Sequence, residues 1–251
     1  MPSFDLTGKA AIVTGANTGL GQAIAVALAQ AGADIAAVGR TAPTQTQGLV
    51  EALGRRFAPI AADLASLEPI ERVVEGTLAA LGSVDILVNN AGIIRRADAI
   101  DFTEADWDAV MDVNLKTTFF LSQAVARRML AQGRGGKIIN IASMLSFQGG
   151  IRVPSYTAAK SGLAGLTKAL ANEWAAHGIN VNAIAPGYFE TNNTEALRAD
   201  ETRSRDILAR IPAGRWGAPA DLGGAAVFLA SSAADYVHGS VLAVDGGWLG
   251  R

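Results

Sequence analysis

One tyrosine, one lysine and one serine have the residue types and the spacing for chemistry in this sequence. Tyr156 and Lys160 are four residues apart and would lie on the same face of a helix beginning after Pro154. A phenol titrates at about pH 10, and a fixed ammonium one helical turn away favours the phenolate and lowers that pKa. Ser143 could hold a substrate oxygen while Tyr156 moves the proton. The three side chains therefore predict proton transfer at a carbonyl or alcohol oxygen.

The surroundings of these residues support this chemistry, because the tyrosine–lysine spacing alone equally describes an amphipathic surface pair. Residues 137–141 are a short apolar run, which is typical of a buried strand. Ser143 would then lie just past the carboxyl end of that strand, where open α/β sheets bind their ligands. Ser155 is placed to cap the helix that follows.

A glycine-rich turn near the amino terminus predicts a phosphate-binding loop. An apolar strand at residues 9–14 leads into this turn, and an alanine-rich helix at residues 22–31 follows it. Backbone N–H groups at such a helix start bind anions, and glycine lets the anion approach closely. The spacing is Gly-x-x-x-Gly-x-Gly, so a tight turn with close helix–sheet packing is the alternative. The expected cofactor contacts are Gly15, Asn17, Thr18, Gly19, Leu20 and Gly21.

The residues after the second and third expected strands bear on the choice between NAD and NADP. An acid after the second strand would bind the ribose 2′-hydroxyl of NAD, whereas an arginine accommodates the 2′-phosphate of NADP. Here the acid is missing and Arg40 is present, which favours NADP on the strength of one side chain. The strand at residues 57–61 leads to Asp63 and Leu64. The Asp63 carboxylate could reach the adenine amine, or it could cap a helix beginning near Ser66.

Amide side chains follow the fourth expected strand and interrupt the next helical stretch. Residues 84–88 read as that strand, and the turn after it suits close packing against a cofactor or an ordinary turn. The cofactor contacts expected in this turn are Asn90, Ala91 and Gly92. Asn114 lies inside a helical stretch that runs to about Gln132, where asparagine is unfavourable. It is therefore either a site residue or a buried amide satisfied by the backbone.

A long polar segment after the sixth expected strand is typical of a substrate lid. The strand at residues 179–184 leads to Pro186 and Gly187, two further cofactor contacts, and the polar segment 188–211 follows. Strands and helices alternate along the chain without a linker or repeat. The sequence thus predicts an α/β fold, a single-domain Rossmann-type doubly wound parallel β-sheet flanked by helices, over residues 1–251.

Composition supports one large globular domain and excludes several kinds of site. The chain has 251 residues, is 50% hydrophobic and 18% charged, and has a net charge of -2. Such a near-neutral charge argues against electrostatic binding to nucleic acid or to a membrane surface. With no cysteine and two histidines, neither disulfides nor a metal site is expected. The sequence shows neither a signal peptide nor a membrane-spanning run, so a cytoplasmic location is expected.

These motifs resemble the short-chain dehydrogenase/reductase family over essentially the full length. The matching elements are Thr14-Gly-x-x-x-Gly-x-Gly21, Asn89-Asn-Ala-Gly92, Asn114, Ser143, Tyr156-x-x-x-Lys160 and Pro186-Gly187. The resemblance implies that Tyr156 is the acid/base and that Ser143 polarises the carbonyl. Lys160 would bind the nicotinamide ribose and lower the tyrosine pKa, and Asn114 would anchor a water in the proton relay. It also implies a contact from Thr191 to the carboxamide region of the cofactor, and a homotetramer.

Four further segments resemble a group of this family that acts on deoxy sugar acids. These segments are residues 91–96, 142–156, 191–194 and 210–217. The resemblance implies hydride transfer between a nicotinamide cofactor and a keto or hydroxy group of a sugar acid. The acid would be of the 2-dehydro-3-deoxy-D-gluconate or 2-deoxy-D-gluconate type, as in pectin degradation. This resemblance favours NAD(H), in conflict with Arg40, so NADP(H) stays open.

A sugar acid carries a carboxylate, and three arginines are placed to meet it. Arg152 lies in the loop between Ser143 and Tyr156, and Arg95 and Arg96 follow the fourth strand. The planar fork of arginine can bind a carboxylate with two parallel hydrogen bonds. Surface or intersubunit ion pairs are the alternative for these three side chains. The expected substrate contacts are Arg95, Arg96, Ser143, Leu145, Gln148, Arg152, Tyr156 and Asn192.

Two other functions fit the same motifs. A related reductase of another carbonyl, such as a 3-oxoacyl thioester or a polyol, would carry the same catalytic side chains. A cofactor-binding sensor that had lost catalysis would be expected to lack one of them. Asn114, Ser143, Tyr156 and Lys160 are all present, so the sequence favours an enzyme.

Overall fold

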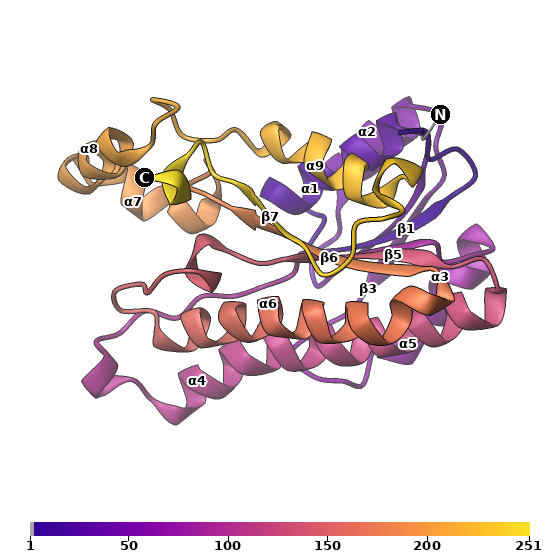
Figure 1. Ribbon diagram of the computed structural model, residues 1–251, viewed down its shortest axis with the longest axis horizontal. Coiled ribbons are helices and arrows are strands. Elements are labelled where there is room, and N and C mark those ends of the chain that lie inside the picture. Colours follow the sequence, from indigo (N-terminus) through magenta and orange to yellow (C-terminus); the bar gives the residue numbers. More distant parts are fainter. Residues whose placement is uncertain (1–2) are drawn as a thin grey trace.

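The computed structural model describes residues 3–251 and contains a seven-stranded parallel sheet (Figure 1). The strand order is β3-β2-β1-β4-β5-β6-β7. The strands are β1 (Ala10–Thr14), β2 (Asp34–Gly39), β3 (Phe57–Ala61), β4 (Ile86–Asn89), β5 (Gly136–Ile141), β6 (Ile179–Pro186) and β7 (Val241–Val244). The chain builds outward from β1 to β3 and then in the other direction from β4 to β7. The expected fold class is confirmed, with the topological switch between β1 and β4.

Helices cover both faces of this sheet (Figure 1). They are α1 (Gly19–Gln30), α2 (Thr44–Ala52), α3 (Ile70–Leu81), α4 (Glu104–Met111), α5 (Thr117–Gln132), α6 (Pro154–Trp174), α7 (Glu195–Ala199), α8 (Glu201–Arg210) and α9 (Gly223–Ala230). One face is covered by α1, α2 and α9, and the other by α3, α5 and α6. The short helices α7 and α8 lie beside the sheet, within the polar segment 188–211 expected to form a lid.

The central strand β1 shows why apolar runs mark the strands of this sheet. It is buried at every position, because helices cover both of its faces. Ala11 and Val13 pack toward α1 and α9, whereas Ala10 and Ile12 pack toward α3 and α5. Both sets must therefore be apolar, and the strand reads as a continuous hydrophobic run.

Two local expectations about helix starts are wrong. Ser155 does not cap α6, because the helix already begins at Pro154, whose preset φ suits the first helical position. The Ser155 hydroxyl is instead buried in the first turn, without a hydrogen-bond partner among residues 3–251. Helix α3 begins later than expected, and Asp63 does not cap it. The Asp63 carboxylate accepts a hydrogen bond from the Ala65 N–H at 3.0 Å within a local turn.

Over residues 3–251, no helix combines the length with the hydrophobicity that crossing a bilayer requires.

Candidate active site

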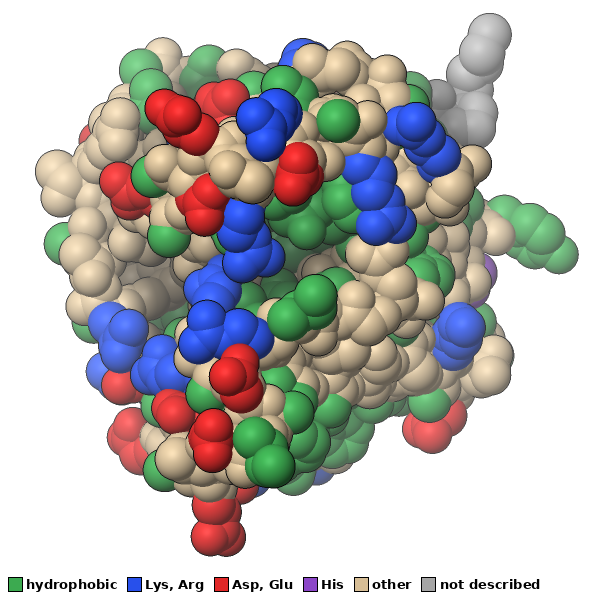
Figure 2. Space-filling view, turned by 90° about the vertical axis from the view of Figure 1, so that its left-hand side faces the viewer, with side chains coloured by type: hydrophobic (Ala, Val, Ile, Leu, Met, Phe, Trp, Pro, Cys, Tyr) green, Lys and Arg blue, Asp and Glu red, His purple; other side chains and the backbone are tan. Residues whose placement is uncertain are grey.

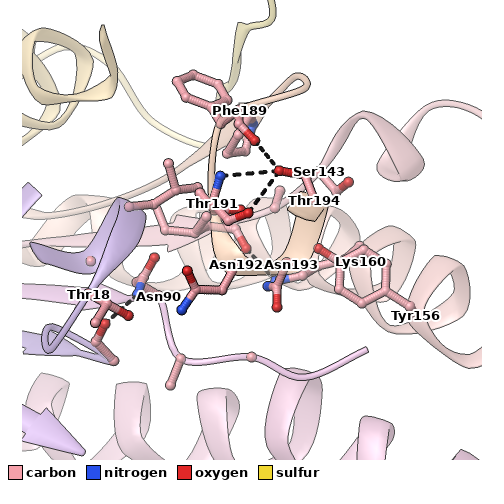
Figure 3. A pocket seen from close by; sticks show the side chains of 18 of the residues that line it. Thr18, Asn90, Ser143, Tyr156, Lys160, Phe189, Thr191, Asn192, Asn193 and Thr194 are labelled. Carbon is pink, nitrogen blue, oxygen red and sulfur yellow. Dashed lines mark hydrogen bonds between the residues drawn. The ribbon is translucent and has the colours of Figure 1, made fainter. Parts of the chain in front are cut away.

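The side chains of Ser143, Tyr156 and Lys160 converge beside the carboxyl end of β5, as the sequence predicts. β5 ends at Ile141, and Ser143 begins a 3-10 turn in which its Oγ accepts a hydrogen bond from the Leu145 N–H at 3.1 Å. Tyr156 and Lys160 project from the first two turns of α6. All three residues line one cavity of about 360 Å³ (Figure 3).

Lys160 is a buried lysine whose ammonium is held by the strand beneath it. The residue is 4% exposed, and its Nζ donates a hydrogen bond to the Ile141 carbonyl oxygen at 2.5 Å. The same Nζ lies 5.6 Å from the centre of the Tyr156 ring. Burial strips water from the ammonium and lowers the pKa of Lys160 to about 8. This lysine therefore titrates much closer to neutral pH than an exposed one.

The pKa of Tyr156 moves in the opposite direction from the one expected. Burial is the largest effect and raises the pKa of the phenol, while a hydrogen bond with the Ser143 side chain and the positive charge of Arg96 act to lower it. Lys160 is not among the groups that lower this pKa, and its ammonium is bonded to the Ile141 carbonyl. The expected lowering by Lys160 is therefore wrong for this conformation.

Asn114 lies in a π-helical turn, Asp112–Lys116, that joins α4 to α5. It is buried, its Oδ1 accepts a hydrogen bond from the Ile93 N–H, and its Nδ2 donates one to the Ile93 carbonyl oxygen, both at 2.8 Å. The amide thus fastens the segment after β4 to the helix pair. This matches the alternative of a buried amide satisfied by the backbone, and single π turns are also frequent at functional sites.

The glycine-rich turn forms a concave cradle, and any residue larger than glycine at its glycine positions would fill that space. Gly15 has φ +66°, and a Cβ added at Gly21 would overlap the Gly15 carbonyl oxygen and the Asn90 amide. The Asn90 Nδ2 donates hydrogen bonds to the carbonyl oxygens of Thr14 at 2.9 Å and Gly15 at 3.2 Å, which ties the end of β4 to this turn. No side chain of the described chain caps the first turn of α1. Its first backbone N–H groups are therefore left for an anion.

Two adjoining cavities form one groove across the switch point between β1 and β4. The second cavity, of about 370 Å³, shares four lining residues with the first, namely Gly15, Asn17, Ala91 and Gly92. At its far end lie Arg40, Asp63 and Leu64, which follow β2 and β3. The groove thus has an anion cradle in its middle, polar side chains at one end and the Ser143–Tyr156–Lys160 group at the other. This shape and these groups fit an elongated dinucleotide.

Thr194 organises the segment between β6 and the lid helices. Its Oγ1 lies 2.5 Å from the Phe189 carbonyl oxygen and 3.0 Å from that of Thr191, and it accepts a hydrogen bond from the Thr191 N–H at 3.1 Å (Figure 3). The expected contacts Thr18, Leu20, Pro186, Gly187, Thr191 and Asn192 line the first cavity. Sequence analysis missed Phe189, Asn193 and Thr194, which line it too. The Thr-x-x-Thr spacing of 191–194 is a capping signature that could have found the turn.

Two of the three arginines expected at the substrate have acidic partners. The Arg152 Nε lies 2.9 Å from the Asp98 carboxylate, and the Arg95 Nε lies 3.2 Å from that of Asp106. All four side chains are substantially exposed, so these are the surface ion pairs that the sequence left as the alternative. Arg95 nevertheless lines the second cavity.

Arg96 is the third arginine expected at the substrate. Its charge acts on the pKa of Tyr156, and its Nη2 donates a hydrogen bond to the Asn193 carbonyl oxygen at 3.3 Å. Arg96 therefore links the segment after β4 to the polar segment 188–211. Lys and Arg side chains gather beside the hollow on this face of the molecule (Figure 2).

Leu145 and Gln148 lie in the loop between β5 and α6. The Leu145 carbonyl oxygen accepts a hydrogen bond from the Ser161 Oγ at 3.1 Å, and the Gln148 Oε1 accepts one from the Trp248 Nε1 at 3.3 Å. Nothing in the sequence pairs Gln148 with Trp248, because 100 residues separate them.

Comparison with known proteins identifies the family. Residues 15–249 match the short-chain dehydrogenase model described as enoyl-(acyl carrier protein) reductase. The chain belongs to the short-chain dehydrogenase/reductase family. The 2-dehydro-3-deoxy-D-gluconate 5-dehydrogenase of Escherichia coli is 62% identical over 251 residues, covering 100% of this chain and 99% of that protein.

Two solved members of the family have the same fold and carry a cofactor. A structure from Agrobacterium tumefaciens, assigned as a 2-deoxy-D-gluconate 3-dehydrogenase with bound NADP, is 63% identical, has a TM-score of 0.94 and covers 99% of each chain. A gluconate 5-dehydrogenase of Burkholderia cenocepacia, in complex with NADP and tartrate, is 42% identical. Its TM-score is 0.93, with 99% of this chain and 98% of that chain covered.

Membership of the short-chain dehydrogenase/reductase family confirms two expectations. The chain is an oxidoreductase, and it uses a nicotinamide cofactor. Both solved relatives carry NADP, so the comparisons do not support the expected preference for NAD(H).

Proposed function

We propose that this enzyme interconverts a ketone and a secondary alcohol on a deoxy sugar acid of the 2-dehydro-3-deoxy-D-gluconate type. The observation that carries this proposal is the position of Arg96, which donates a hydrogen bond to the Asn193 carbonyl oxygen and whose charge acts on Tyr156. Asn193 lines the cavity of Ser143, Tyr156 and Lys160. One substrate could therefore place its reacting oxygen at Tyr156 and its anionic group at Arg96. The identity of 62% with the E. coli 2-dehydro-3-deoxy-D-gluconate 5-dehydrogenase supports the same substrate class.

Tyr156 is proposed as the acid/base and Ser143 as the group that orients the substrate oxygen. When bound in the groove, the nicotinamide accepts or supplies the hydride. In the reducing direction, the Tyr156 hydroxyl gives its proton to the carbonyl oxygen, and the Ser143 hydroxyl donates a hydrogen bond to that oxygen. The phenolate left on Tyr156 is stabilised by the positive charge of Arg96 and by the hydrogen bond with the Ser143 side chain. In the oxidising direction the proton returns to Tyr156.

The other site residues are proposed to bind and to position. Lys160 holds the nicotinamide ribose from α6, and Asn114 keeps the segment after β4 against the helix pair. Thr191 contacts the carboxamide end of the cofactor, and the lid 188–211 covers the substrate as part of the same single domain. We also place this chain in a homotetramer.

The substrate proposal makes Arg96 the group that binds the carboxylate. Arg96→Ala is expected to raise KM for 2-dehydro-3-deoxy-D-gluconate by roughly 10–150-fold, because a charge-assisted bond to the acid is lost. Cofactor-linked absorbance with this acid and with a neutral ketone of similar size measures the effect. KM for the neutral ketone should be nearly unchanged, since it has no carboxylate to lose, and any fall in its kcat reports the loss of the Arg96 charge near the Tyr156 phenolate.

The same assay decides between Arg96 and Arg152. Arg152 is replaced by glycine rather than alanine, because its φ of +64° strains any residue with a Cβ. A larger rise in KM for Arg152→Gly than for Arg96→Ala would contradict the proposal and return the carboxylate to Arg152. A panel that includes a 3-oxoacyl thioester and a polyol tests the substrate class itself. Faster turnover of either one would contradict the sugar-acid assignment.

Arg40 supports NADP(H) as a cofactor of this enzyme. It borders this end of the groove directly after β2, at the place in the sequence where an acid would repel a 2′-phosphate. Arg40→Ala is expected to raise KM for NADP(H) by roughly 10–100-fold and to leave KM for NAD(H) nearly unchanged. Steady-state assays with each cofactor make the comparison. Equal effects on both cofactors would show that Arg40 does not contact the 2′-phosphate.

A further inference from the structure

The last residues of the chain return to the loop that carries Ser143. After β7 the chain turns through Gly246 and Gly247, with φ +65° and +90°, into the short turn Trp248–Gly250. A Cβ added at Gly246 would lie 2.9 Å from the Ile211 Cγ2, so this turn packs directly against the end of the lid segment. The Asp245 carboxylate accepts hydrogen bonds from the Gly247 N–H at 2.9 Å and the Leu249 N–H at 2.8 Å. Trp248 is thereby held in one place.

Trp248 contacts both ends of the lid segment. The side chain is buried, with the residue only 5% exposed. Its ring centre lies 4.8 Å from that of Tyr188, where the lid segment begins. The Arg210 guanidinium lies over the same indole at 4.0 Å, at the end of α8. Trp248 therefore joins the two ends of this segment to the body of the enzyme.

The indole of Trp248 also fixes the orientation of the Gln148 amide. Its Nε1–H can only donate, so the atom facing it at 3.3 Å must be the Gln148 oxygen. The amide NH₂ of Gln148 is then turned away from Trp248. Gln148 lies in the loop between Ser143 and Tyr156, both of which line the catalytic cavity. Without this hydrogen bond, the Gln148 amide could turn either its oxygen or its nitrogen away from Trp248. With it, the NH₂ donor is the group that faces away.

We infer that Trp248 is a positioning residue, which holds Gln148 as a hydrogen-bond donor to a hydroxyl or carboxylate oxygen of the substrate. This inference rests on the proposed sugar-acid function. A donor suits such a substrate, because an amide oxygen turned toward its carboxylate would repel it.

A double-mutant cycle tests the coupling between Trp248 and Gln148. Trp248→Phe keeps an aromatic ring for Tyr188 and Arg210 but removes the N–H. Its KM for the sugar acid should rise roughly 2–10-fold, with kcat and the cofactor KM changed less than about 2-fold. In a Gln148→Leu background, Trp248→Phe should have no further effect on KM, because the residue it acts through is gone. Trp216→Phe is the matched control, since Trp216 packs on Tyr188 at 5.4 Å in the same cluster.

Two results would overturn the inference. Additive effects of Trp248→Phe and Gln148→Leu on KM would show that the two residues act separately. An equal rise in KM for Trp216→Phe would assign the effect to aromatic packing alone. The NMR resonance of the Trp248 indole N–H needs no substrate and should shift in Gln148→Leu but not in Trp216→Phe. An unshifted resonance contradicts the contact, whereas failure of the parent enzyme to turn over the sugar acid contradicts the proposed function instead.

Discussion

Replacement of Tyr156 by phenylalanine is expected to lower kcat by roughly 10²–10⁴-fold, the usual contribution of a positioned acid/base. The variant keeps the aromatic ring at this position of α6 and removes only the hydroxyl that faces Ser143. Cofactor affinity should survive, because the glycine-rich turn and the groove are untouched. Steady-state turnover of the sugar acid, together with a fluorescence titration of NADPH, measures both quantities.

The matched control for this substitution is Tyr236→Phe. Tyr236 is fully exposed and lies outside the groove, so its hydroxyl should contribute nothing to turnover. Because burial raises the pKa of Tyr156, oxidation of the alcohol, which needs the phenolate, should become faster as the pH rises. Turnover by Tyr156→Phe within a few-fold of the parent would remove Tyr156 from the proposed mechanism.

The buried ammonium of Lys160 is expected to make the enzyme more stable at alkaline pH. The pKa of Lys160 is about 8 in the folded enzyme and 10.5 for the free side chain. Between these values the unfolded chain binds more protons than the folded one, so the free energy of unfolding rises with pH. The cost of burying the charge is fully present below pH 8. From about pH 7 to about pH 10 the gain should reach about 2–3 kcal/mol.

Comparison with Lys160→Met isolates this contribution from other titrating groups. Urea unfolding at several pH values measures the free energy of unfolding of enzyme and variant. Between about pH 7 and about pH 10 this free energy should rise by about 2–3 kcal/mol more in the parent than in Lys160→Met. Lys168→Met is the control, because Lys168 is exposed on the same helix and should not change the slope. Parallel curves for parent and Lys160→Met would show that Lys160 is solvated in the folded enzyme.

Much of the fold follows from local pattern alone. Strands buried on both faces read as apolar runs, so β1 and β5 appear in the sequence within about a residue of their positions. The glycine-rich turn can be recognised because positions such as Gly21 leave no room for a Cβ. Tyr156 and Lys160 come together through helical periodicity, which depends only on their spacing. The order of these motifs along the sequence also indicated the doubly wound parallel sheet and the family.

Helix starts were harder to predict from the sequence, because they depend on which residue first adopts helical geometry. Ser155 is of a residue type that often caps helices. However, α6 begins at Pro154, so Ser155 lies buried inside the first turn. Likewise, the π turn around Asn114 adds a residue to a helical stretch that reads as regular. Neither the helix start at Pro154 nor the π turn changes the hydrophobic periodicity of the sequence, so periodicity could not predict them.

The sequence by itself determined which groups can do chemistry here, and the tertiary structure decided which partner each group has. Arg95, Arg96 and Arg152 are equivalent as residue types, yet two have carboxylate partners and the charge of Arg96 acts on Tyr156. Lys160 bonds to the Ile141 carbonyl, and its burial sets its pKa. The physical reason is that hydrogen bonds and desolvation act over a few ångströms in space. Local patterns report neighbours along the chain, whereas these partners are brought together only by folding.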